Sequence, residues 1–384
     1  MPVLGKWEDI SKWAALKGGF DEDLPTLVER VASLTRNSHP VVVSGFTSGV
    51  FNIVFHVVFD DDVDWVCRVH KNDPAVSPLC IQSKIDSTVA TMRYITSRIP
   101  SFPVPKVHAF ESNPVTSALH AAYIFMDFVN GFQVKQSSTE DDVVHKQLAT
   151  MAMRLSELRF SKIGPIYQCL TTRDFYVGAF VDDQGVQHGP YETATQYFLS
   201  ATSKIEKEHA QWRVNHVENT ALSLEMCSLY TRAASMLTDY TCGSFPLVHH
   251  DFGTHNTLFQ HNADGKLELA AIIDWDGAST GTWLQFCMFP VFLGIRWPTL
   301  ERGGYSQLVL DRIDRRQRIY VKQLKEEEST MPSSGERPTD LHRLVDSPAV
   351  RVVEFILEYS DPYFNCDGEM FRKYLKAWRE DVDW

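Results

Sequence analysis

Residues 245–276 read FPLVHHDFGTHNTLFQHNADGKLELAAIIDWD. A polar loop is followed by two strand-like runs, and Asp264-Gly265 between them predicts a hairpin because glycine tolerates the positive φ of a tight turn. A hairpin of this length folds Asp274, at the end of the second strand, back toward the loop. We therefore expect Asp274 to converge with Asp251 and Asn256 on a single point.

Two carboxylates and an amide oxygen are hard ligands. They suit Mg²⁺, which binds a few protein oxygens together with phosphate oxygens and water. A transition-metal site is a much weaker alternative, since the spacing of the histidines in this loop matches no zinc motif. An acyltransferase motif of the HHxxxDG type is weaker still, because it requires Asp at position 254, which is Thr.

The rest of the chain predicts an α+β protein whose strands come early and whose helices dominate later. Alternating apolar residues predict three consecutive strands within residues 41–69, the first two joined by a glycine turn. A further buried strand is expected at 121–129. Helices are expected over residues 7–36, 79–98, 139–160, 191–209 and 218–238.

The spacing His249-x-Asp251-x-x-x-x-Asn256, followed by Asp274, resembles the catalytic and metal-binding motifs of the aminoglycoside phosphotransferase family, to which protein kinases are related. The similarity runs from about residue 40 to 290. Three other segments are similar to fungal members in particular: residues 89–95, 103–107 and 155–164.

The resemblance implies a role for each matching residue. Asp251 would orient or deprotonate an acceptor hydroxyl, His249 would brace the loop, and Asn256 and Asp274 would hold Mg²⁺. The residues expected to contact ATP are Gly45, Ser48, Gly49 and Asn52 in the glycine turn, Arg68 on the third strand, and Met126 and Phe128 at the hinge. The glycine turn is not a Walker A loop, because no Gly-Lys-Ser/Thr follows it.

Three positions depart from the family pattern. Arg68 stands where the family has a phosphate-binding lysine, although arginine can also grip phosphate. Thr88 stands where a helix glutamate should pair with that cation, so we expect the cation to be less well held. His250 replaces a glycine between the catalytic His and Asp. Lys71 is expected on the opposite strand face from Arg68, since it lies an odd number of residues away.

Composition narrows the classes of function. The 384 residues are 44% hydrophobic and 22% charged, which is typical of a globular protein with a substantial core. A formal charge of −12 argues against binding to a nucleic-acid backbone. Seven scattered cysteines without a Cys-x-x-Cys pair indicate free thiols, and the acidic turn at 60–64 lacks the Gly and Glu of a calcium loop. With no signal peptide and no apolar run of membrane-spanning length, we expect a cytoplasmic protein without a membrane partner.

These observations predict a bilobal, protein-kinase-like fold. We expect a small β-rich N-terminal lobe (1–125), a hinge (126–131) and a larger helical C-terminal lobe (132–384). The predicted function is ATP- and Mg²⁺-dependent phosphorylation of a hydroxyl on a small molecule. The alternative is a pseudokinase, or a kinase fold used for other chemistry or ligand binding, which the departures at Arg68, Thr88 and His250 favour. The sequence leaves the acceptor and the oligomeric state open.

Overall fold

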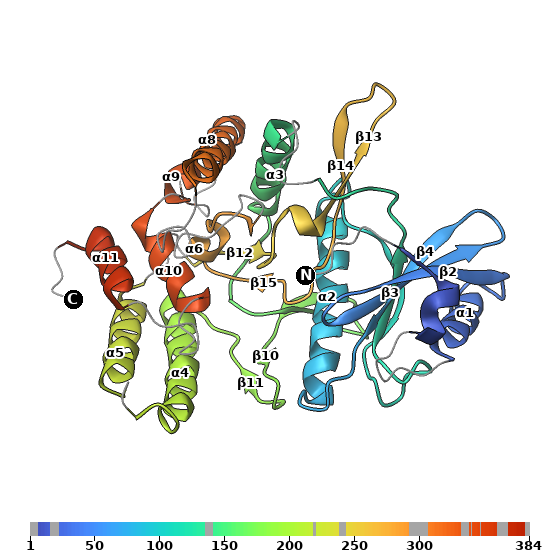
Figure 1. Ribbon diagram of the computed structural model, residues 1–384, viewed down its shortest axis with the longest axis horizontal. Helices are drawn as coiled ribbons and strands as arrows, with labels where there is room; N and C mark the ends of the chain where they lie inside the picture. The colour runs from blue at the N-terminus through green and yellow to red at the C-terminus, as the bar shows by residue number, and fades with distance from the viewer. Residues whose placement is uncertain are drawn as a thin grey trace. The chain divides into compact units, whose positions relative to one another are not determined.

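The computed structural model describes residues 7–15, 23–134, 141–217, 220–237, 243–291, 306–331, 338, 340–345, 347–358 and 368–380 (Figure 1). The chain forms two compact units. Unit 1 comprises residues 1–138, 165–188 and 254–278, and unit 2 comprises residues 139–164, 189–253 and 279–384. Strands dominate the first part of the chain and helices the last, so the predicted α+β class is confirmed.

Unit 1 is built on a six-stranded antiparallel sheet with the order β1-β2-β3-β4-β6-β5. Its strands are β1 (Glu8–Asp9), β2 (Val41–Ser48), β3 (Asn52–Phe59), β4 (Asp64–His70), β5 (Val107–Glu111) and β6 (Tyr123–Asp127). The three predicted strands within 41–69 are confirmed. The prediction of helix throughout 7–36 is wrong at its start, where β1 pairs with β2 and a short 3-10 helix, η1 (Ile10–Ala15), follows.

Each face of this sheet is covered by one long helix. On one face, α1 (Leu24–Thr35) packs in a core cluster that includes Val28, Phe55, Cys67 and Phe125. On the other face, α2 (Pro78–Arg98) packs through Ile81, Ile85 and Val89 against Ala122 and Ile124. Arg68 lies opposite Ile124 in the register of β4 and β6, and directly opposed residues share a face. Arg68 therefore lies on the face that α2 covers.

Unit 1 also contains three two-stranded hairpins and a 3-10 turn. These are β8 (Ile166–Gln168) with β9 (Phe175–Val177), β10 (Phe180–Val181) with β11 (Gln187–His188), and β13 (Thr257–His261) with β14 (Leu267–Ile272), which follows η3 (Thr254–Asn256). The hairpin predicted from Asp264-Gly265 is confirmed, with Gly265 at φ 72°.

Unit 2 is mainly helical. Its long helices are α3 (Asp141–Leu155), α4 (Ala194–Arg213), α5 (Thr220–Met236), α8 (Gln307–Thr330), α10 (Pro348–Glu358) and α11 (Gly368–Trp378), and its short ones are α6 (Trp283–Phe286) and α9 (Leu341–Leu344). A small antiparallel sheet, β15 (Ser279–Thr280), β12 (Phe245–Val248) and β7 (Arg159–Phe160), supports the loop that begins at His249. Trp283 is 2% exposed, as expected of a core residue.

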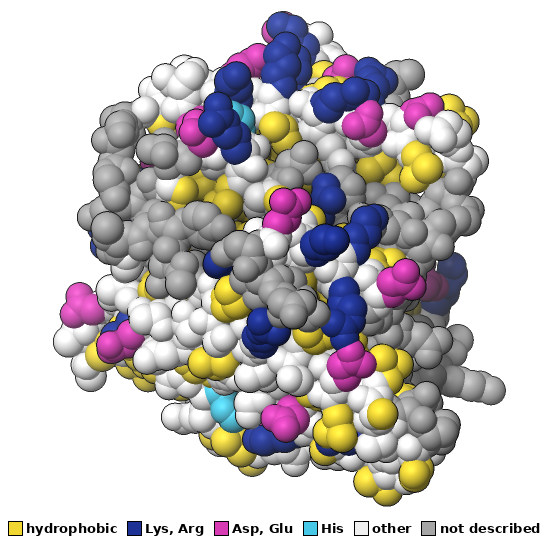
Figure 2. Space-filling model, turned by 90° about the vertical axis from the view of Figure 1, so that its left-hand side faces the viewer, with side chains coloured by type: hydrophobic (Ala, Val, Ile, Leu, Met, Phe, Trp, Pro, Cys, Tyr) yellow, Lys and Arg dark blue, Asp and Glu magenta, His cyan; other side chains and the backbone are white. Residues whose placement is uncertain are grey.

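On the face drawn in Figure 2, the described Lys and Arg side chains lie among Asp and Glu side chains and small apolar areas. In the part of the chain that the structure describes, no helix combines the length and the apolar character needed to cross a bilayer.

Candidate functional site

The glycine turn joins β2 to β3 and is tied to the residue that follows β4. Gly49 donates its backbone N–H to the carbonyl of Asn52 at 2.8 Å, which closes the turn. Lys71 donates its Nζ to the Gly49 carbonyl at 2.5 Å and its backbone N–H to the Phe51 carbonyl at 2.8 Å. Lys71 therefore holds the turn, and Ser48 and Asn52 flank it as the last residue of β2 and the first of β3.

Gly45 lies inside β2, away from this turn. A Cβ atom at this position would stand 2.8 Å from the backbone carbonyl oxygen of Glu8, closer than side chains are found in proteins. Since β1 pairs with β2 at this point, the absence of a side chain at position 45 lets the edge strand approach.

Arg68 points from the centre of β4 into a polar cluster that is almost closed to solvent. The residue is 8% exposed, and its Nη1 lies 2.6 Å from Oδ1 of Asp276 and 3.4 Å from Oδ1 of Asp274. Its Nε and Nη2 are buried, and the described residues offer them no hydrogen-bond partner. Arg68 thus keeps two donor nitrogens unused after pairing with the carboxylates.

The expectation that this cation would be poorly held is wrong. Its partner is Asp276, whose side chain is 9% exposed and also receives a 3.0 Å hydrogen bond from the Thr88 hydroxyl. Lys84 adds its Nζ at 3.8 Å from the other carboxylate oxygen. Burial alone would raise the pKa of Asp276, but the charges of Arg68 and Lys84 and the hydrogen bonds from Arg68 and Thr88 hold that pKa below its usual value.

Two residues that we expected to bind a metal are brought close together by the β13–β14 hairpin. The backbone N–H of Ile273 donates to the Asn256 carbonyl at 2.9 Å, so Asn256 and Asp274 belong to adjacent strand ends. Asn256 is 4% exposed, whereas the Asp274 side chain is 44% exposed. Asp274 has φ 61°, a conformation that is rare for residues other than glycine and is often found at functional sites.

The loop with the predicted catalytic Asp lies in unit 2 and follows β12. His249 is 3% exposed, and its carbonyl accepts the backbone N–H of Asp251 at 2.8 Å. His250 has φ 62°, which explains why a glycine suits this position. The His250 ring nitrogen Nε2 is hydrogen-bonded to the Ser279 hydroxyl at 2.7 Å, and this bond fixes the side chain that replaces the glycine.

The predicted hinge, residues 126–131, begins within β6, which ends at Asp127. Met126, on β6, packs against the α2 core cluster. Phe128 stacks on His56 with ring centroids 4.2 Å apart, and the two ring nitrogens of His56 are hydrogen-bonded to Ser44 and Asp64. The stack gives Phe128 a fixed position at the end of the sheet.

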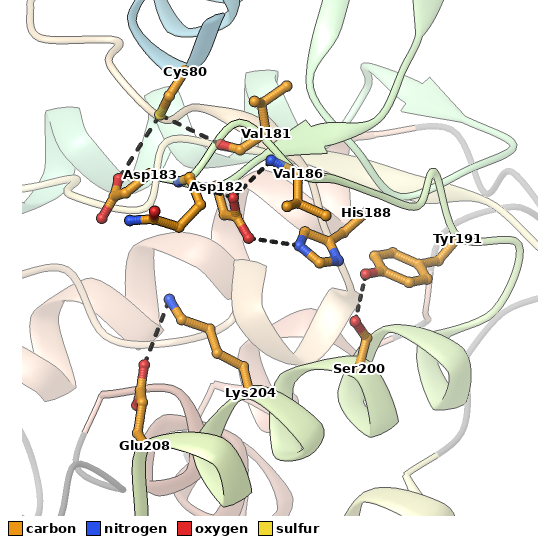
Figure 3. Close-up of polar contacts among 11 residues, drawn as sticks. Cys80, Val181, Asp182, Asp183, Val186, His188, Tyr191, Ser200, Lys204 and Glu208 are labelled. Carbon is orange, nitrogen blue, oxygen red and sulfur yellow. Dashed lines mark hydrogen bonds and ion pairs between the residues drawn. The ribbon is translucent and has the colours of Figure 1, made fainter. Parts of the chain in front are cut away.

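Helix α2, which carries Lys84 and Thr88, is fastened at its N-terminus by the β10–β11 hairpin. The backbone N–H of Ser77 donates to the Asp183 carbonyl at 2.7 Å. Cys80 Sγ donates to the Val181 carbonyl at 3.5 Å (Figure 3). Within the hairpin, Asp182 is hydrogen-bonded to His188 Nε2 at 2.9 Å. The sequence predicts mainly helices in the later part of the chain, so it does not predict this hairpin or its contact with α2.

Unit 2 has a cavity of about 250 Å³ behind the His249 loop. Its lining is mostly apolar and aromatic, with Glu358 as the acidic residue among those described. Asp251 does not line it.

Comparison with known proteins places the chain in a family. Residues 42–285 match the family described as the phosphotransferase enzyme family. No curated protein matches the sequence. A candidate aminoglycoside phosphotransferase from Ralstonia eutropha JMP134 superposes with a TM-score of 0.52 at 14% identity, over 92% of this chain and 97% of that one. This likeness shows the fold, and the predicted kinase-like architecture is confirmed.

Two further solved structures are similar at lower scores. A candidate fructosamine-3-kinase from Thermobifida fusca gives a TM-score of 0.47 at 14% identity, over 92% of this chain and 99% of that one. An ethanolamine kinase from Plasmodium vivax gives 0.44 at 12% identity, over 95% and 94%. Both scores are below that of the Ralstonia structure.

Proposed function

Because the chain belongs to the phosphotransferase enzyme family, we propose that it uses ATP and Mg²⁺ to phosphorylate a hydroxyl group on a small molecule. The observation that carries the proposal is the pair of unused donors on Arg68. A buried donor without a partner costs about 1–3 kcal/mol. A ligand with phosphate oxygens would satisfy both, since arginine binds phosphate through two parallel hydrogen bonds.

The residues around Arg68 fit a nucleotide bound with a divalent cation. Asp274 offers an accessible carboxylate 3.4 Å from the guanidinium, and Asn256 offers an amide oxygen on the adjacent strand end. Oxygen ligands of this type favour Mg²⁺. The Gly49 turn, tied down by Lys71, is the proposed cover for the phosphates, and the segment at Met126 and Phe128 is the proposed contact for the base.

The proposed chemistry needs few protein groups. When bound, ATP would supply the phosphoryl group and Mg²⁺ would neutralise its charge. Asp251 is the proposed base: its carboxylate takes the proton of the acceptor hydroxyl as the new O–P bond forms and the bridging oxygen leaves with ADP. Arg68 binds phosphate oxygens, and His249 supports the backbone of the Asp251 loop through its carbonyl.

The first test is thermal unfolding with and without Mg-ATP. A ligand at about 100 times its dissociation constant adds about 2.7 kcal/mol, which raises the Tm by several degrees. We expect this rise in the wild type and in Asp264→Ala, which removes an exposed carboxylate at the far end of the same hairpin. We expect Asp274→Ala to lose most of it.

An acceptor screen follows, with ADP release as the signal. Turnover that needs an acceptor and is lost in Asp251→Asn would exclude the pseudokinase alternative. The proposal is refuted if millimolar Mg-ATP leaves the wild-type Tm unchanged, or if folded Asp274→Ala is stabilised as strongly as the wild type.

A further inference from the structure

In protein kinases, a glutamate on the helix next to the sheet pairs with the phosphate-binding cation. Here the corresponding helix α2 presents Thr88, whose side chain is a hydroxyl. We propose that Asp276 is the positioning residue for Arg68, so that the loop that carries the metal ligand also anchors the phosphate-binding cation. The inference rests on the proposed function and adds to it the role of a residue that the family motif does not assign.

The contact between Arg68 and Asp276 has the geometry of a strong ion pair. Nη1 and Oδ1 are 2.6 Å apart, and each side chain is 9% exposed. Water therefore screens the pair little, and a charge-assisted hydrogen bond of this length is stronger than one between neutral groups. Among the described residues only Nη1 has partners, so the pairing holds the guanidinium and leaves Nε and Nη2 for a ligand.

The position of Thr88 indicates that Arg68 can pair with an acid at 88 or with an acid at 276, but not with both. Its hydroxyl stands 3.0 Å from Oδ1 of Asp276, the same oxygen that pairs with Arg68. A carboxylate at position 88 would lie against that of Asp276, and two like charges so close would oppose ionisation of both. A hydroxyl at 88 can instead donate a hydrogen bond to the carboxylate.

Lys84 completes the charge balance of the cluster. Its Nζ lies 3.8 Å from Oδ2 of Asp276 and 5.1 Å from the centroid of the Phe51 ring, at the tip of the glycine turn. Arg68 and Lys84 therefore meet Asp276 from two elements, the sheet and α2. Asp274, two residues away along the chain, contacts the same Nη1 at 3.4 Å. The anchor of the cation and the proposed metal ligand therefore lie on the same short stretch of chain.

The test removes the acid at position 276 and places one at position 88 of α2. Mg-ATP affinity is measured by titration calorimetry on the wild type, Asp276→Asn, and the double variant Thr88→Glu/Asp276→Ala. Circular dichroism and the Tm without ligand establish that each variant is folded. We expect Asp276→Asn to weaken Mg-ATP binding about tenfold or more. The double variant should recover to within about threefold of wild type, because its glutamate can occupy the volume that Asp276 vacates.

Asp61→Asn is the matched control. It removes the carboxylate of another Arg–Asp pair of unit 1, in which Arg36 binds Asp61 through two hydrogen bonds at 2.8 and 2.6 Å on the exposed β3–β4 turn. Its Mg-ATP affinity should equal that of the wild type.

The outcomes separate the inference from the proposed function. A wild type that does not bind Mg-ATP overturns both. A wild type that binds, with folded Asp276→Asn within twofold of it, overturns the role of Asp276 alone. A folded double variant without recovered affinity also overturns it, since a distorted loop would then explain the loss. If Asp276→Asn does not fold, the double variant decides the question by itself.

Discussion

Arg68→Met should lower the free energy of unfolding of the ligand-free protein by about 2 kcal/mol. Removing one member of a buried ion pair costs about 3–5 kcal/mol. The lower end applies here, because the Thr88 hydroxyl at 3.0 Å and the Lys84 ammonium at 3.8 Å still face the Asp276 carboxylate. The variant also removes two buried donors that have no partner among the described residues, and this relief returns about 1 kcal/mol.

The assay is a double-mutant cycle of urea unfolding with Arg68→Met, Asp276→Asn and the double variant. Each single change leaves a buried group without its partner, whereas the double change removes both, so we expect a coupling energy of about 2 kcal/mol. A parallel cycle on Arg36 and Asp61 provides the comparison. That pair is more exposed, with side chains 20% and 39% exposed, and its coupling should be clearly smaller. A coupling of Arg68 with Asp276 below about 0.5 kcal/mol would refute the assignment of a buried pair.

Three further predictions concern stability. The pKa of His145 is lowered to about 3, chiefly by burial and further by the charge of Arg316. His145 binds a proton near pH 6.5 in the unfolded chain but only near pH 3 in the folded chain. The folded state therefore has its full stability above pH 6.5 and loses part of it as the pH falls toward 3. His145→Gln should therefore reduce the loss between pH 7 and pH 5 by about 2 kcal/mol in urea unfolding, and an unchanged pH slope would contradict this. Gly45→Ala would place a methyl group 2.8 Å from the Glu8 carbonyl oxygen. We expect chemical denaturation to show that the free energy of unfolding falls by about 1–3 kcal/mol. An unchanged free energy of unfolding would mean that β1 does not pack against position 45. At His250, with φ 62°, replacement by Gly should destabilise less than replacement by Ala, by about 1 kcal/mol in the same assay, and the opposite order would show that the backbone is not strained.

The elements that the sequence predicts well are those with local signals. Alternation of apolar residues predicted three strands between 41 and 69, and the helix expected at 79–98 is α2, Pro78–Arg98. Its start is set locally, since the Ser77 side chain accepts the Leu79 N–H and a proline follows the cap. Strand β1 has no such signal. Its two residues, Glu8 and Asp9, are both exposed, and they pair with β2 only because Gly45 leaves room.

The candidate site divides in the same way. The motif from His249 to Asp274 could be predicted from the sequence because its residues lie on one hairpin and the loop before it. The counter-ion of Arg68 could not be assigned, because Asp276 lies more than two hundred residues further along the chain and its contact depends on the packing of three elements. The sequence has Thr at position 88 where the family has an acid, and this departure is the sign that another acid pairs with Arg68.

That signal has a physical meaning. A guanidinium is seldom buried without a counter-charge, because desolvating it costs several kcal/mol, a large part of the net stability of a typical domain. When the residue that usually supplies the charge is missing, an acid from another element has to reach the same point, or the cation has to turn toward solvent. Arg68 is 8% exposed, so it has not turned toward solvent, and Asp276 is the acid from another element that pairs with it. Charge neutrality at a buried site is thus a stronger constraint than the identity of any one aligned residue. A departure such as Thr88 therefore calls for a search for compensation before it is taken as a sign of lost activity.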